Sequence, residues 1–238
     1  MSRRDQHRAA LRALDAEGVR AHLTAGSGLP GPRADLELVA AFADVAPAGL
    51  VLELADDPDE YLRCCGTAAV GRLLLDGDAD PRLLDLLHAR AADPLWRVRE
   101  AAAMALQRVG DADPAALRHL VAAWVTDPHP LVRRAAVAGI CEPRLLHDPV
   151  TAGAALHSCA LATGSIEALP ARARRDPDVR TLRQALGYCW SVAVAADPAA
   201  GLPAFAALAR STDPDVAWID RENRRKTRLR RLLADPGT

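Results

Sequence analysis

The sequence is poor in lysine, in aromatic residues and in paired cysteines. A single lysine, Lys226, stands among 30 basic residues, so the arginine content reflects a compositional bias and is weak evidence for phosphate binding. Aromatic residues make up 3% of the chain, which leaves too few strand-forming side chains for an extensive sheet. The odd set of cysteines has no CxxC pair, which excludes a disulfide framework and a zinc knuckle and predicts buried thiols. These residues are Cys64, Cys65, Cys141, Cys159 and Cys189.

Export signals, membrane spans and catalytic fingerprints are also missing. The segment 1–18 lacks the apolar core of a signal peptide, and the apolar stretches near 149–162 and 191–209 are too short or interrupted to cross a membrane, so we expect a cytoplasmic protein. No GxSxG, HExxH, Walker or dinucleotide motif occurs, and the segment GSGLPG lacks the Lys-Ser/Thr ending of a phosphate loop. His119 and His157 have no metal-ligand spacing and are interpreted as packing or surface residues. We expect no cofactor and no metal.

Alanine is abundant and dominates the apolar half of the chain. By count it makes up about a fifth of the residues, well above ordinary usage. Alanine is the best helix former and its small side chain lets helix axes approach closely. The formal net charge of -1 offers no global attraction to nucleic acid or to an anionic membrane. The composition therefore predicts closely packed helices.

Ten of the 17 prolines directly follow an aspartate. An aspartate at the N-cap accepts hydrogen bonds from the free amides of the first turn, and a proline at N1 has no amide to leave unpaired. We therefore predict that each of these dipeptides except the last begins a helix. They lie at residues 57–58, 80–81, 93–94, 113–114, 127–128, 148–149, 176–177, 197–198, 213–214 and 235–236.

Five of these dipeptides open similar phrases, at Asp57, Asp93, Asp127, Asp176 and Asp213. Their spacings of 36, 34, 49 and 37 residues are typical of stacked helical hairpins. The phrases resemble the second helix of HEAT repeats: Asp-Pro, three residues, Leu or Val, Arg, then small residues. The resemblance implies an all-α, right-handed α-solenoid of about five HEAT-like repeats. We expect a helical cap of two or three helices over 1–46 and one continuous array over 47–238, closed by a basic C-terminal helix.

The HEAT resemblance also implies a ladder, in which the aspartate of one repeat pairs with the arginine of a neighbour. The fourth copy shifts its arginine to Arg183 and the fifth has Ile219 in that place, so we expect the ladder to end before the C-terminus. The expected ladder residues share a six-residue offset and are Asp57/Arg63, Asp93/Arg99 and Asp127/Arg133.

A second, weaker resemblance is to HEAT-like alkylpurine DNA glycosylases of the AlkD type. Those enzymes use a Trp and an acidic residue one helical turn apart, with a basic residue one repeat later. Trp96, Glu100 and Arg134 match this arrangement, and Tyr188 or Trp190 would be the cleft aromatic. The resemblance implies that the carboxylate stabilises a cationic sugar while aromatic faces hold the departing base. The acid is Glu here instead of the usual Asp. Trp96 as a half-buried packing residue and Glu100 as a solvent-facing residue are the alternative interpretation.

The segment 221–231 carries the strongest charge asymmetry of the chain. It holds seven basic residues and one acid, a local charge of +6, so the remainder of the chain carries -7. One interpretation is a solvated capping helix docked by Leu229, Leu232 and Leu233; the other is a site for phosphate or an acidic partner. In a continuous helix, Arg224, Arg225, Arg228 and Arg231 would lie along one face. The expected binding residues are Arg221, Arg224, Arg225, Lys226, Arg228 and Arg231.

These patterns favour a non-enzymatic interaction or scaffold module. We expect it to be a monomer that binds a protein or peptide on the concave face formed by the second helices. The alternative is a DNA-binding HEAT-like protein related to the alkylpurine glycosylases, with weak and non-specific nucleic-acid binding through the basic segment.

Overall fold

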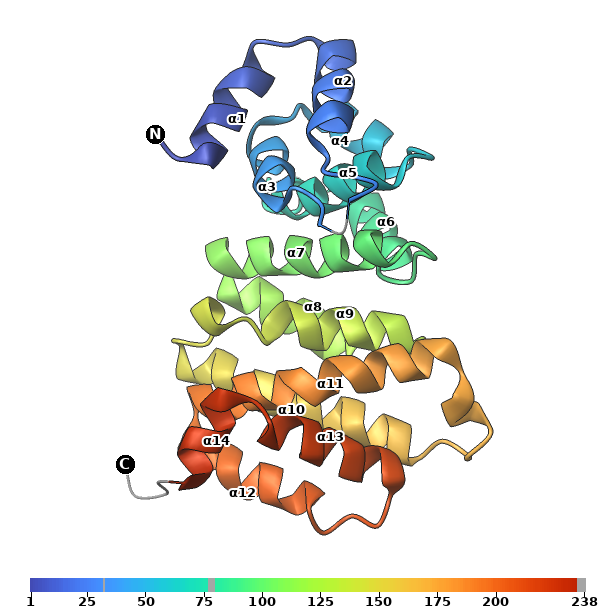
Figure 1. Ribbon diagram of the computed structural model, residues 1–238, viewed down its shortest axis with the longest axis vertical. Coiled ribbons are helices and arrows are strands. Elements are labelled where there is room, and N and C mark those ends of the chain that lie inside the picture. The colour runs from blue at the N-terminus through green and yellow to red at the C-terminus, as the bar shows by residue number, and fades with distance from the viewer. Residues whose placement is uncertain (32, 77–79, 235–238) are drawn as a thin grey trace. The chain divides into compact units, whose positions relative to one another are not determined.

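The computed structural model describes residues 1–31, 33–76 and 80–234, and all regular elements in these ranges are helical. The chain divides into two compact units, Met1–Ala112 and Asp113–Thr238. Each unit is built from stacked helical hairpins, the arrangement of an α-solenoid (Figure 1). The hand of the superhelix and the folding of the chain as one continuous domain stay predictions.

The first unit contains three N-terminal helices followed by two hairpins. In the hairpins α4 packs on α5 and α6 on α7, while α1, α3, α5 and α7 follow one another as neighbours. Three helices lie before residue 47, and their role as a cap of the array stays a prediction. The helices are α1 (Arg3–Arg12), α2 (Ala16–Gly26), α3 (Leu36–Val45), α4 (Ala48–Ala55), α5 (Glu60–Leu73), α6 (Pro81–Ala91) and α7 (Trp96–Ala112).

The second unit contains three hairpins and a closing helix. The pairs are α8 with α9, α10 with α11 and α12 with α13; the second helices α9, α11 and α13 are neighbours, and α14 packs on α11 and α13. Together with the two hairpins of the first unit, these supply the expected five repeats. The helices are α8 (Pro114–Trp124), α9 (Pro130–Ile140), α10 (Pro149–Glu167), α11 (Pro177–Ala196), α12 (Pro198–Leu208), α13 (Pro214–Arg224) and α14 (Thr227–Ala234), with 3-10 turns η1 (Pro143–Leu145) and η2 (Ala173–Arg175).

Small residues bring the helices of the core together. A Cβ on Gly71 of α5 would overlap the backbone of Ala105 on α7, so these two helices meet backbone to backbone. In α7 the buried residues Val98, Ala102, Leu106 and Val109 follow at three- and four-residue steps and form one stripe. All five cysteines are buried as reduced thiols, as predicted.

The Asp-Pro dipeptides have two different roles. Asp80, Asp113, Asp148, Asp176, Asp197 and Asp213 are N-cap residues followed by Pro in the first turn, as predicted. The prediction is wrong for Asp57, Asp93 and Asp127. Their carboxylates accept a hydrogen bond from the backbone N–H two residues later, at 2.9, 2.9 and 2.7 Å, because the chain makes a turn before α5, α7 and α9 begin. Asp235–Pro236 lies outside the described residues.

An ion-pair ladder joins neighbouring repeats, in part as expected. Arg63 Nη1 lies 3.2 Å from the buried Asp93 carboxylate of the following repeat, and Arg20 of α2 lies 2.5 Å from Asp57. The arginines also have a role that was not predicted, since Arg63, Arg99 and Arg133 each donate to the backbone carbonyl of the aspartate six residues earlier.

The ladder was expected to end before the C-terminus, and the last copy indeed has no arginine at the ladder position, although other arginines pair with its carboxylates. Arg174 of η2 pairs with Asp213 at the start of the last repeat. Arg183 Nη1 reaches Asp215 at 2.5 Å. Ile219 is a fully buried core residue. The carboxylates of the last repeat therefore keep arginine partners, although these come from positions outside the repeat pattern.

Candidate functional site

The basic C-terminal segment forms two helices instead of one. α13 ends at Arg224 and α14 begins at Thr227, with a turn between them in which the Lys226 N–H donates to the Asn223 carbonyl at 2.9 Å. The predicted ridge of four arginines on one helix face is therefore wrong, because Arg224 and Arg228 belong to different helices.

Two of the seven basic side chains in this segment are neutralised locally. Arg224 Nε donates to both carboxylate oxygens of Asp220, at 3.0 and 2.8 Å, and this hydrogen bonding raises the pKa of Arg224. Arg225 pairs with Glu222 at 2.9 Å. The remaining five form no ion pair with a carboxylate in the described part of the chain. We call them the C-terminal cationic surface: Arg221, Lys226, Arg228, Arg230 and Arg231.

Tyr188 of α11 lies within this surface. Tyr188 is 43% exposed, and its hydroxyl accepts a hydrogen bond from Arg228 Nη2 at 2.9 Å. The Arg228 guanidinium and the Lys226 ammonium lie 5.1 and 5.9 Å from the ring centroid, within the range of cation–π contacts. Tyr188 thus orders two of the five cations and joins the surface to a second helix of the array.

The C-terminal helix is docked by fewer leucines than predicted. Leu229 is fully buried, as expected, and Leu232 is half-buried. Leu233 is 39% exposed, so its predicted docking role is wrong. Helix α14 spans eight residues, and Leu229 is its one fully buried side chain among the described residues.

Asn223 anchors α13 and was missed by the sequence analysis. Its side chain is fully buried between α13 and α11. Nδ2 donates to the Leu186 and Ile219 carbonyls, both at 2.8 Å, and Oδ1 accepts the Ser191 N–H at 2.8 Å. Every polar group of the amide therefore has a partner, which holds the cationic surface against α11.

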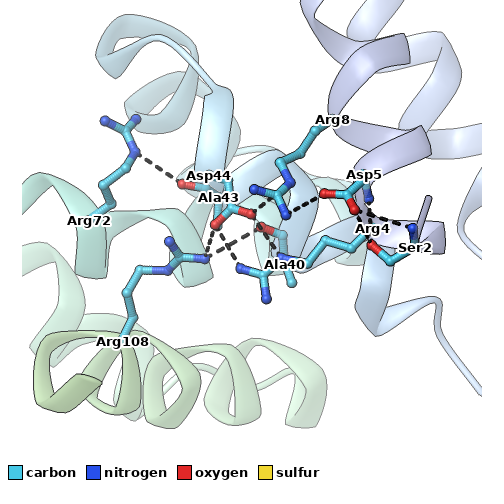
Figure 2. A network of polar contacts seen from close by, with 9 residues as sticks. All are labelled: Ser2, Arg4, Asp5, Arg8, Ala40, Ala43, Asp44, Arg72 and Arg108. Carbon is cyan, nitrogen blue, oxygen red and sulfur yellow. Dashed lines mark hydrogen bonds and ion pairs between the residues drawn. The ribbon is translucent and has the colours of Figure 1, made fainter. Parts of the chain in front are cut away.

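The first unit contains a separate polar network centred on Asp44 of α3 (Figure 2). Arg4 binds both carboxylate oxygens at 2.8 Å, Arg108 of α7 reaches Oδ1 at 2.8 Å and Arg8 approaches Oδ2 at 3.5 Å. Arg72 of α5 donates to carbonyls in and just beyond the last turn of α3. Arg72 and Arg108 both stand 15 residues after the Asp of their repeat phrase, which was the available sequence signal. The network joins four helices and is structural.

The comparisons with known proteins agree with this architecture. The family model described as HEAT repeats matches residues 47–141. Residues 47–141, the HEAT segment, are therefore similar to HEAT repeats. The HEAT segment covers α4 to α9, and the hairpins that follow it continue the same pattern of paired helices. The comparison with curated proteins gave no match.

Several solved structures resemble the HEAT-containing chain. Two engineered proteins are 16% and 14% identical to it, covering 94% of this chain and 95% and 97% of theirs, each with a TM-score of 0.38. A designed armadillo repeat protein in complex with the peptide (KR)4 is 13% identical, covering 93% of this chain and 98% of its own, also with a TM-score of 0.38.

The residues of the catalytic alternative lie on three helices. Trp96 and Glu100 share α7 in the first unit, whereas Arg134 lies on α9 and Tyr188 on α11 in the second. The exposed Trp96 ring already carries the Arg97 guanidinium 4.6 Å from its centroid. Trp190 is 1% exposed, so its suggested role as a cleft aromatic is wrong.

The described residues contain neither a candidate membrane span nor a group of metal ligands. None of the helices in the described ranges combines the length and apolarity needed to cross a bilayer. Within 1–31, 33–76 and 80–234, no three His, Cys, Asp or Glu side chains are grouped to hold an ion. The exposed His119 and His157 are surface residues.

Proposed function

We propose that the chain is a non-enzymatic interaction module that binds an acidic segment of a protein partner through the C-terminal cationic surface. The observation that carries the proposal is the group of five cations that have no carboxylate partner among the described residues, two of them ordered by Tyr188. An exposed aromatic beside arginines is the composition of an interface anchor. The surface lies beside α11 and α13, which belong to the layer of second helices expected to receive a partner.

Local geometry favours a short acidic peptide over duplex DNA. The five cations lie on the ends of two short helices and not along one continuous ridge. Such a surface contacts about three or four phosphates, so DNA binding should be weak. The logarithm of the binding constant should fall with the logarithm of the salt concentration with a slope of about -3. A flexible peptide can follow the turn between α13 and α14, whereas a duplex cannot.

Replacing Arg221, Arg230 and Arg231 together by glutamine should weaken binding strongly while the fold survives. These side chains are exposed and make no contacts that hold the helices. We expect affinity for a glutamate-rich peptide at low salt to fall about tenfold or more, measured by fluorescence anisotropy. The control replaces three exposed arginines elsewhere, Arg12, Arg82 and Arg210, and should change affinity about twofold or less.

Two outcomes of this experiment would contradict the proposal. One is equal loss of affinity in both triple variants, which would show that only the total charge matters. The other is tighter, salt-sensitive binding of duplex DNA than of the acidic peptide, which would favour the nucleic-acid alternative.

The glycosylase alternative gives a separate prediction. We expect no release of N3- or N7-alkylated purines from duplex DNA, because Arg97 covers the Trp96 face that would receive a cationic base. Base excision is measured by chromatography of the released bases, with Trp96→Ala and Glu100→Gln as the paired variants. Release that depends on Glu100 would overturn the non-enzymatic assignment.

A further inference from the structure

A pocket lies where α13 begins, beside η2 and the first two turns of α11. Its volume is about 730 Å³ and it opens to solvent. Four guanidinium groups and two carboxylates line it, which gives the pocket a formal charge of +2. The charged lining residues are Arg174, Arg175, Arg180, Arg183, Asp213 and Asp215.

The two carboxylates of the pocket are already fully engaged. Asp213 pairs with Arg174 and caps α13 by accepting the N–H groups of Asp215 and Val216 at 2.9 and 3.2 Å. Asp215 pairs with Arg183 at 2.5 Å. Arg174 also donates to two backbone carbonyls of the preceding segment, at 2.8 and 2.7 Å. Arg174 and both aspartates therefore form a fixed wall.

Arg175 and Arg180 have open donors, and Arg183 keeps an open Nε–H beside its bond to Asp215. Arg175 and Arg180 are exposed and form no ion pair with any described residue. Arg183 is held over the Trp218 ring at 4.7 Å, and its buried Nε–H finds no acceptor among the described residues. The pocket thus presents three guanidiniums and an uncompensated double charge.

We infer that this pocket binds a phosphomonoester dianion. A phosphate monoester carries a charge of about -1.5 to -2 at neutral pH and offers three acceptor oxygens, which matches the charge and the donors of the pocket. Guanidinium groups bind such oxyanions through paired N–H donors, whereas a single carboxylate would neutralise only half of the excess charge. The pocket lies at the opposite end of α13 from the C-terminal cationic surface, so this inference stands independently of the proposed function.

The test titrates the intact protein with inorganic phosphate, sulfate and acetate at equal ionic strength. At about pH 8 we expect phosphate and sulfate to bind in the millimolar range and to shift the Nε–Hε NMR signals of Arg175, Arg180 and Arg183, with acetate about fivefold weaker. At about pH 5.5 phosphate should bind more weakly than at about pH 8, because it loses its second charge. Sulfate keeps both charges, so its affinity should stay the same at the two pH values. No histidine lines the pocket, and although burial raises the pKa of Asp213, its bond with Arg174 holds that pKa below the usual value.

Matched variants identify the site. Arg175→Gln and Arg180→Gln should each weaken phosphate binding about fivefold. Arg172→Gln should leave it unchanged, because Arg172 is an exposed neighbour that does not line the pocket. A phosphoserine peptide and its unphosphorylated form show whether the phosphate belongs to a partner protein or to a small ligand. Tighter binding of the phosphopeptide than of free phosphate supports a phosphorylated partner. Equal binding of the two supports a small phosphate ligand. The inference is overturned if neither phosphate nor sulfate saturates the protein, or if Arg172→Gln weakens binding as much as Arg175→Gln.

Discussion

Asn223→Asp is expected to lower the unfolding free energy of the second unit by about 3–5 kcal/mol at neutral pH. The change keeps the size of the side chain and the acceptor for the Ser191 N–H. It removes both donors, so a buried carboxylate would face the Leu186 and Ile219 carbonyl oxygens at 2.8 Å. Neither the charge nor the two carbonyls would have a compensating partner.

The signature of this effect is its pH dependence. Burial and the two carbonyls raise the pKa of the introduced carboxyl in the folded state, so its neutral form is favoured on folding. The stability that protonation restores is present below the unfolded pKa of about 4 and is lost as pH rises through the folded pKa. The deficit relative to the native protein should therefore shrink as pH falls.

Gln184→Glu is the control for this substitution. It makes the same amide-to-acid change at an exposed position of α11 and should cost about 0.5 kcal/mol or less. Urea unfolding with hydrogen exchange resolved to α11 and α13 measures the loss in the unit concerned, because two compact units need not unfold together. Equal, small losses in both variants would show that the Asn223 bridge contributes little.

The Asp-Pro pattern predicts a helix start correctly where the aspartate itself is the N-cap. It misses the starts where a turn lies between the aspartate and the helix. Asp113 and Asp148 cap helices as their Asp-Pro dipeptides predict. Asp93 has the same dipeptide, but its carboxylate accepts the Leu95 N–H within the turn and also a bond from Arg63, and the helix begins at Trp96. The contact with Arg63 comes from another repeat, and no local pattern contains it.

The candidate site depends on contacts that composition does not reveal. The charge of segment 221–231 and the four-residue spacing of Asp220 and Arg224 are visible in the sequence. No Gly or Pro marks the break between α13 and α14 in the sequence. Asn223 is fully buried although its sequence neighbours are charged, so the charged run gives no sign of its burial. The position of Tyr188 among the cations depends on that break. The prediction of four arginines on one face of a continuous helix therefore could not include it.

Asp44→Asn is expected to cost the first unit about 2–4 kcal/mol. The Asp44 side chain is 14% exposed, and three guanidiniums from α1 and α7 converge on it. Without its charge, Arg4, Arg8 and Arg108 would face one another in a partly dry site, and α1 would lose its main polar attachment to α3. Asp76→Asn is the matched control, because Asp76 is 68% exposed and lies 3.9 Å from Arg72; it should cost about 0.5 kcal/mol or less.

The pH profile and a double variant separate this network from a general loss of charge. Burial raises the pKa of Asp44, but hydrogen bonds from Arg4 and Arg108 outweigh burial and hold the pKa below its ordinary value. The stability from this carboxylate is therefore present above the unfolded pKa of about 4 and is lost as pH falls through the folded pKa, so the deficit of Asp44→Asn should shrink below about pH 4. Arg108→Gln should cost at least about 1 kcal/mol less in the Asp44→Asn background than in the native protein, because its partner is already gone. Additive losses in urea unfolding, or a deficit that stays constant down to low pH, would show that Asp44 does not hold these arginines together.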